Sequence, residues 1–178
     1  MKSFFIVALA MVLAACSGPT TRDYATRTPT LDLREYLNGD LVAKGILFDY
    51  RGRVDTTFRV DMTGTWKGNK GTLAEHFLYS DGREEDRIWH ITFTDDHRFT
   101  ATAADVIGKA EGTQHGNSVN MQYVLNAKRP DGDTITLSMD DWMYLLDDRT
   151  LINRTSMHKY GLKVGELVIT FERKGEHE

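Results

Sequence analysis

The most constraining feature of this chain is a period-two alternation of apolar and polar residues over residues 54–66. Acidic, basic and threonine side chains fall between the apolar ones. Successive side chains of a β-strand point to opposite faces, so the alternation predicts a strand with one buried face and one solvent-exposed face. The apolar members are Val54, Phe58, Val60, Met62 and Trp66.

Further segments of this kind follow one another, separated by short turns such as Arg51-Gly52 and Asp81-Gly82. Between residues 104 and 119 the glycines predict bulges or sharp bends. Sequential hairpins predict an all-β, antiparallel up-and-down barrel of about 8–10 strands, rather than a Greek-key sandwich. The solvent-exposed face predicted for residues 54–66 carries charged side chains. This argues against a membrane-spanning barrel, whose outer band is apolar. The other predicted strands are 41–50, 72–80, 87–94, 98–104, 119–125, 134–139, 151–157 and 164–173.

A short helical turn is predicted just before the first strand, over residues 31–37. Its apolar residues follow helical spacing, and Thr30 or Asp32 is available as the N-cap. We expect this turn to close one end of the barrel.

The start of the chain predicts export. Residues 1–15 combine one lysine with an unbroken apolar run, which is typical of a secretory signal peptide and too short for a transmembrane helix. The lone cysteine, Cys16, would then be the first mature residue, and no intramolecular disulfide is possible. An ordinary signal peptide followed by a free thiol is the alternative to a lipidated cysteine.

The block Leu13-Ala14-Ala15-Cys16 resembles the lipobox of bacterial lipoproteins. The resemblance implies that Cys16 is lipidated and that the protein is held on a membrane by this anchor. With Ser17 in the next position, it also implies the periplasmic face of the outer membrane in a Gram-negative bacterium.

The remaining chain divides into three parts. Residues 16–30 have almost no apolar content, so we predict a flexible tether between the lipid and the domain. Residues 31–173 are predicted to form the barrel domain, and residues 174–178 a polar tail.

The composition argues against nucleic acids and metal ions as partners. The formal net charge is -4 and no basic block occurs, which argues against nucleic-acid binding. The six histidines form no metal-ligand spacing, so we expect no metal and no cofactor. We expect a monomer.

Three blocks resemble an uncharacterised family of Gram-negative lipoproteins, DUF3833. They are GTLAEHFLYSDGREEDRIW at 71–89, TATAADVIGKAEGTQHGNSVNMQYVL at 100–125, and DDWMYLLDD at 140–148, with TLINRTSMHKYGLKVGEL following at 150–167. The resemblance covers roughly residues 35–173. It implies a lipidated envelope protein with a lipocalin-like or calycin-like barrel, and it supplies no catalytic residues.

Two charged residues fall on faces that are otherwise apolar. Glu75 shares its parity with Leu73 and Phe77, and Arg87 shares its parity with Trp89. A three-residue turn at 81–83 would set Glu75 opposite Trp89 and diagonal to Arg87. The two charges would then neutralise each other or lie at the rim of the barrel. Alternatively, they would form a polar group that orients a ligand inside an apolar cavity.

The aspartates of 140–148 suggest a metal or acid site, but their spacing favours a solvated loop with capping aspartates. We expect the aromatic residues between them to cover the barrel mouth or point inward. Candidate ligand-binding residues are Glu75, Arg87, Trp89, Asp105, Asp141 and Trp142.

These features predict a binding module that holds a small hydrophobic or amphipathic, lipid-like ligand in a barrel cavity. One alternative is an enzyme that uses Glu75, Asp105 or the Asp140 cluster as acid or base on such a molecule. Another is an envelope structural or assembly factor with a filled core. The volume of the cavity distinguishes these functions, because a binding module or an enzyme needs an open cavity and a structural factor does not.

Overall fold

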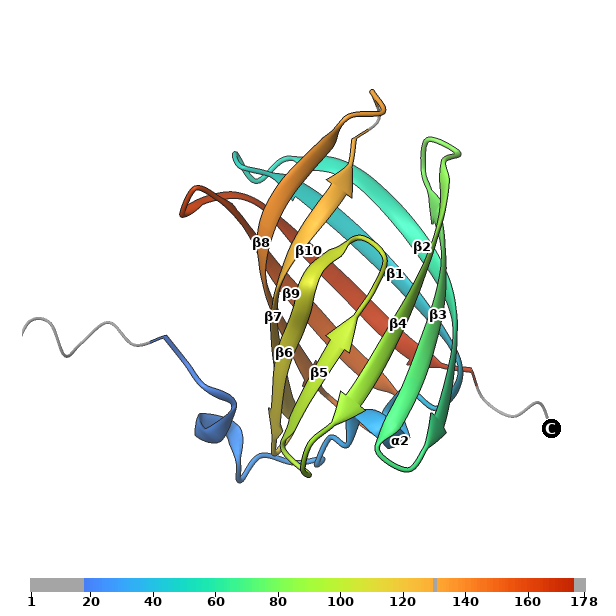
Figure 1. Ribbon diagram of the computed structural model, residues 1–178, viewed down its shortest axis with the longest axis vertical. Helices are drawn as coiled ribbons and strands as arrows, with labels where there is room; N and C mark the ends of the chain where they lie inside the picture. Colours follow the sequence, from blue (N-terminus) through green and yellow to red (C-terminus); the bar gives the residue numbers. More distant parts are fainter. Residues whose placement is uncertain (1–17, 130, 175–178) are drawn as a thin grey trace, which may run out of the picture.

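The computed structural model describes residues 18–129 and 131–174. Cys16, the predicted signal peptide and residues 175–178 lie outside these ranges. Within them, ten antiparallel strands form one closed barrel in which each strand pairs with the next and β1 pairs with β10 (Figure 1). The strands are β1 (Gly39–Asp49), β2 (Val54–Lys67), β3 (Lys70–Tyr79), β4 (Glu84–Phe93), β5 (Arg98–Thr102), β6 (Val106–His115), β7 (Ser118–Lys128), β8 (Thr134–Leu145), β9 (Thr150–Lys159) and β10 (Leu162–Arg173).

The predicted up-and-down barrel is therefore confirmed. The glycine-rich stretch before residue 119 forms β6, and its pairing with β7 shifts register between Ile107 and Glu111. Gly108 lies in this irregular part with φ +72°, a conformation that side chains with a Cβ rarely adopt. The bulge expected from the glycines is present.

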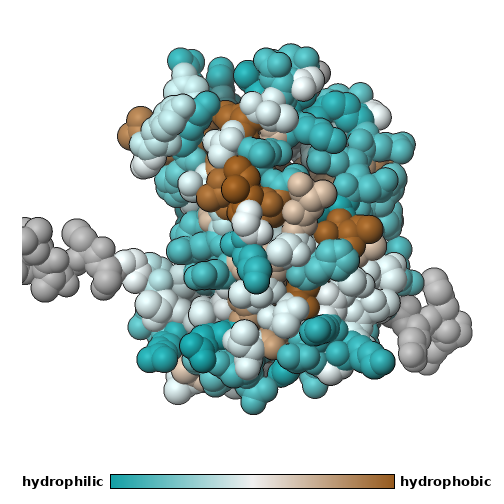
Figure 2. Space-filling view, in the orientation of Figure 1, coloured by the Kyte–Doolittle hydropathy of each residue, from teal (hydrophilic) through white to brown (hydrophobic). Residues whose placement is uncertain are grey.

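The interior of the barrel is apolar and its outside is mainly polar. On β2, Phe58, Val60 and Met62 are buried, as the alternation predicts. Figure 2 shows an outer surface that is mostly hydrophilic, with apolar side chains in small groups across its middle. The core is thus inside the barrel, where the strand periodicity places it.

A single helical turn, α2 (Leu33–Tyr36), closes one end of the barrel, as predicted (Figure 1). Asp32 is its N-cap and accepts a hydrogen bond from the Arg34 backbone nitrogen at 2.9 Å. Leu33 and the C-cap Leu37 are buried in the core. Gly64 on β2 lies directly against the Leu37 carbonyl, so a larger residue there would displace the turn.

Within residues 18–30, which belong to the predicted flexible tether, one short segment contacts the barrel wall. A 3-10 turn, η1 (Thr21–Tyr24), places the Thr21 hydroxyl 3.0 Å from Thr113 Oγ1 and 2.9 Å from His115 Nδ1. The Tyr24 ring meets Trp142 edge-on, at 5.9 Å between ring centroids. Two side chains of η1 thus make specific contacts with the barrel, although residues 16–30 have little apolar content.

The predicted polar tail is described only at Lys174. Its backbone nitrogen donates to the Asp40 carbonyl at 3.0 Å, and its Nζ lies 3.1 Å from Asp61 Oδ1. Across residues 18–129 and 131–174, no helix is long and apolar enough to cross a membrane.

Candidate ligand-binding cavity

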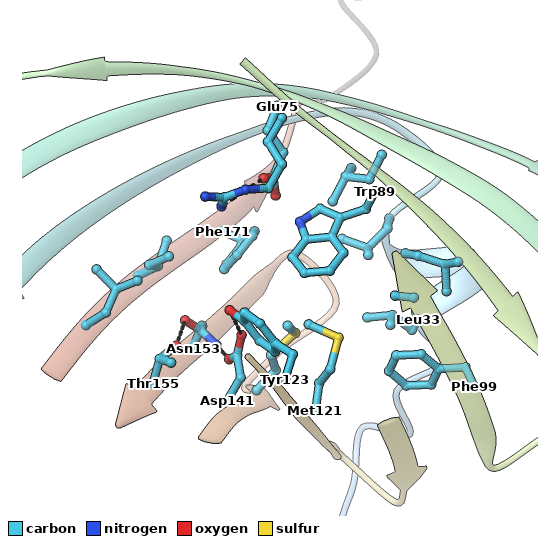
Figure 3. Close-up of a pocket in the computed structure, with 18 of the residues that line it drawn as sticks. Leu33, Glu75, Trp89, Phe99, Met121, Tyr123, Asp141, Asn153, Thr155 and Phe171 are labelled. Atoms are coloured by element: carbon cyan, nitrogen blue, oxygen red, sulfur yellow. Dashed lines mark hydrogen bonds and ion pairs between the residues drawn. The ribbon is translucent and has the colours of Figure 1, made fainter. Parts of the chain in front are cut away.

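A cavity of about 100 Å³ lies inside the barrel above α2. Its walls come from α2 with its C-cap and from β3, β4, β5, β7, β8, β9 and β10. Most of the lining is aliphatic or aromatic, with a few charged and polar side chains pointing into the same space (Figure 3). A mainly apolar cavity with a few convergent polar groups is the usual form of a small-molecule site.

Glu75 and Arg87 reach this cavity from adjacent strands, directly opposite each other on β3 and β4. The turn that joins these strands is closed by Tyr79 and Arg83, with the Tyr79 nitrogen donating to the Arg83 carbonyl at 2.9 Å. The loop is therefore residues 80–82, one position earlier than predicted. The predicted pairing of Glu75 with Trp89 is wrong by two residues, but a shift of two leaves both charges on the inner face.

Arg87 is shared between two carboxylates. Its Nε and Nη2 donate to Asp105 Oδ2 at 2.9 Å and 2.8 Å, and its Nη1 lies 3.7 Å from Glu75 Oε2. Asp105 belongs to the turn between β5 and β6. The exposed fractions of the three side chains are only 10% for Glu75, 17% for Arg87 and 20% for Asp105. Arg87 thus forms a close ion pair with Asp105 and a longer one with Glu75.

Two buried carboxylate oxygens have no hydrogen-bond partner among the described residues, Glu75 Oε2 and Asp105 Oδ1. Burial raises the pKa of Glu75 to about 7, although the Arg87 guanidinium acts in the opposite direction. Glu75 is thus a buried carboxyl group that changes protonation near neutral pH.

A second polar group lies on β7, β8 and β9 (Figure 3). Asp141 accepts hydrogen bonds from the Tyr123 hydroxyl at 3.4 Å and from Asn153 Nδ2. The Thr155 hydroxyl donates to Asn153 Oδ1 at 3.1 Å. Burial raises the pKa of Asp141 to about 6 against the effect of these bonds, and burial followed by the charge of Asp141 raises the pKa of Tyr123.

Trp89 joins the two polar groups across the cavity. Its indole meets the Tyr123 ring edge-on, with the ring centroids 5.4 Å apart. The structure thus brings five of the six candidate residues, Glu75, Arg87, Trp89, Asp105 and Asp141, to one cavity and its edge.

Trp142 does not belong to this cavity, contrary to the expectation that it covers the mouth or points inward. It lies on the outer side of β8, stacked on Tyr144 at 5.9 Å and covered by Tyr24. The loop predicted for residues 140–148 is wrong at its start, because β8 runs on to Leu145. It is right at its end, where Asp147 Oδ1 accepts from the backbone nitrogens of Arg149 and Thr150.

Sequence reasoning missed Tyr123, Asn153 and Thr155 as cavity residues. The signal was available, because Asn153 and Thr155 share their parity with Leu151, which is buried. The rule that singled out Glu75, a polar residue on an apolar face, applies equally to them.

The described part of the chain contains no group of three or more His, Cys, Asp or Glu side chains that could hold a metal ion. The polar groups of the cavity lining are carboxyl groups, one guanidinium, a phenol, an amide, the Thr155 hydroxyl and the Trp89 indole nitrogen.

Comparison with known proteins supports the fold and identifies the family. The crystal structure of Rv2717c from M. tuberculosis matches with a TM-score of 0.57 and 14% sequence identity, covering 84% of this chain and 99% of that one. At this identity the likeness shows the fold alone. Among curated proteins none matches this chain. A family model described as "Protein of unknown function (DUF3833)" matches residues 10–173. The chain therefore belongs to the DUF3833 family.

Proposed function

We propose that this protein is a binding module that holds a small amphipathic molecule inside its barrel. The observation that carries the proposal is a mostly apolar internal cavity faced by a buried, unpartnered carboxylate oxygen of Glu75. A buried polar atom without a partner costs stability, and a bound ligand would supply the missing partner.

The size of the cavity limits the ligand. Pockets for drug-sized molecules usually measure about 300–1,000 Å³, whereas this one measures about 100 Å³. The walls as they stand admit a short ligand, or the end of a longer one, and not a whole long-chain lipid. This narrows the lipid-like ligand expected from the sequence to a compact molecule.

Filling the cavity should abolish binding. Ala101 is buried on the inner face of β5 and lines the cavity, so Ala101→Leu places additional carbon atoms in the ligand's space. We expect affinity for small amphipathic probes to fall at least about tenfold, as for a ligand displaced by direct overlap. Isothermal titration calorimetry measures this change.

Thr100→Leu is the matched control, because Thr100 is the adjacent residue on the same strand and faces outward. It should leave binding unchanged. Equal affinities for wild type and Ala101→Leu would show that the probes bind elsewhere.

The same proposal places the protein on a membrane through a lipid on Cys16, at the periplasmic face of the outer membrane. It rests on the resemblance of residues 13–16 to a lipobox, and on Ser17. We expect Cys16→Ser to give a folded protein that leaves the membrane fraction, because the thiol serves attachment only. Retention of the variant on outer membranes after high-salt washing would contradict this anchor.

Acid–base chemistry is a second candidate function, favoured by one observation. Two carboxyl groups with raised pKa values, Glu75 and Asp141, line the same cavity. Raised carboxyl pKa values are typical of catalytic acids and bases. Mass spectrometry of the bound compound before and after incubation distinguishes the two functions, because only an enzyme changes its mass or isomeric form.

A further inference from the structure

The polar part of the cavity contains more negative than positive groups. Three carboxyl groups, Glu75, Asp105 and Asp141, lie at the cavity or its edge with a single guanidinium, Arg87. With all four groups ionised, the sum is three negative charges and one positive charge, a net charge of -2. A buried site with this imbalance favours a cationic occupant.

The hydrogen-bonding groups show the same imbalance. Arg87 directs its hydrogen bonds to Asp105, and the Asn153 amide donates to Asp141 and to the Trp142 carbonyl. Arg87 Nε and Nη2 and the Asn153 amide are therefore used within the protein, while Arg87 Nη1 makes no hydrogen bond to a described residue. The unpartnered buried atoms of the group are both acceptors, Glu75 Oε2 and Asp105 Oδ1. Each of these two oxygens can accept a hydrogen bond from a donor of the ligand.

Glu75 and Arg87 face each other without a direct hydrogen bond. The distance of 3.7 Å from Glu75 Oε2 to Arg87 Nη1 is beyond hydrogen-bond range. The nearby walls include the aromatic rings of Phe77, Trp89 and Tyr123. Arg87 itself lies over the Phe77 ring at 5.2 Å, which shows that a cation is accommodated against these rings.

An anionic head group fits poorly at the same place. A carboxylate ligand would compete with Asp105 for Arg87 and would lie beside Glu75, so like charges would meet in a buried site. We therefore expect the site to bind fatty acids and similar anions more weakly than cations.

We propose that the ligand is a small primary amine, whose ammonium group donates to Glu75 Oε2 while its short apolar part fills the space above α2. This inference rests on the proposed binding function and deepens it. An ammonium carries three donors on one compact charge, which matches a site with unused acceptors. The volume of about 100 Å³ restricts the apolar part to a short chain.

The test compares three probes of one size, n-butylamine, n-butanol and n-butyrate, by calorimetry at about pH 8 with the Cys16→Ser protein. We expect n-butylamine to bind at least about tenfold tighter than the other two, because only the ammonium group forms an ion pair with Glu75. Glu75→Gln should reduce amine affinity by about tenfold and leave n-butanol affinity nearly unchanged. Glu84→Gln, the same change on the exposed outer side of β4, is the control and should bind like wild type.

The outcomes separate this inference from the proposed function. If n-butyrate or n-butanol binds as tightly as the amine, or if Glu75→Gln binds the amine unchanged, the amine assignment is overturned and the binding function stands. If none of the three binds up to millimolar concentrations, the small-ligand function is overturned together with it.

Discussion

Replacing Arg87 with methionine is expected to lower the free energy of unfolding by about 3–5 kcal/mol near pH 8. Arg87 is mostly buried and is the positive partner of Glu75 and Asp105. Removing it leaves two carboxylates in a site with little water, while methionine keeps most of the packing. The loss should be smaller near pH 5, because Glu75 then escapes the penalty by taking up a proton. Urea denaturation at both pH values measures the effect.

Arg83→Met is the matched control in the same hairpin. Arg83 pairs with Asp81 at the surface, so its loss should cost below about 1 kcal/mol. Combining Arg87→Met with Glu75→Gln and Asp105→Asn should restore most of the stability, because all three charges of this ion cluster are then removed. If Arg87→Met costs no more than Arg83→Met, the internal ion cluster is not buried as described.

Glu75→Gln should stabilise the unliganded protein by about 3 kcal/mol near pH 8 and have little effect near pH 5. The pKa of Glu75 is about 7 in the folded protein against an ordinary value of 4.5. The folded protein therefore retains a proton that the unfolded chain has released. The contribution of Glu75 to wild-type stability is fully present below pH 4.5 and is lost as the pH rises through about 7, whereas the glutamine variant lacks this loss.

Comparing the unfolding free energies of wild type and Glu75→Gln at each pH isolates the contribution of Glu75. The charged and titratable groups facing Glu75 are Arg87, Asp105, Tyr123 and Asp141. Asp141 adds its own loss between pH 3.8 and about 6, in the same direction, so wild type and variant must be compared at each pH. Glu84→Gln should follow the wild-type curve. A constant offset between wild type and Glu75→Gln from pH 5 to pH 8 would contradict the raised pKa.

Glu75→Gln is expected to stabilise the empty barrel and to weaken ligand binding. Such a result would link the stability of the protein to its binding function. Glu75 holds a charge in a site that disfavours it, and under the proposed function the donor of a ligand would offset part of the cost. Such a trade-off between stability and function is common at binding sites. Glu75 and Asp141, whose carboxyl pKa values are raised by burial, both line the cavity.

The sequence predicted the barrel well because strand periodicity is a local property. The alternation over residues 54–66 and the short turns determined the order and direction of the strands. Parity also placed Glu75 and Arg87 on the inner face, because that assignment survives any shift of two residues. Their direct pairing was not predictable, since it depends on which of two adjacent three-residue turns closes the hairpin.

The remaining errors concern contacts between distant parts of the chain. Tyr24 packs on Trp142 and Tyr144, and no local pattern relates residues so far apart in sequence. The strand β8 was cut short because Asp140 and Asp141 look like turn residues. Continuing the alternation of Leu137 and Met139 would have assigned Asp141 and Met143 to the interior.

The central claim is that a small molecule occupies the barrel interior, and native mass spectrometry tests it most directly. The Cys16→Ser protein, purified gently without detergent, should carry one small-molecule adduct that dissociates on activation. The Ala101→Leu protein prepared in the same way should lack the adduct, and Thr100→Leu should retain it. Identical spectra for wild type and Ala101→Leu, whether both carry an adduct or neither does, would contradict a ligand in this cavity.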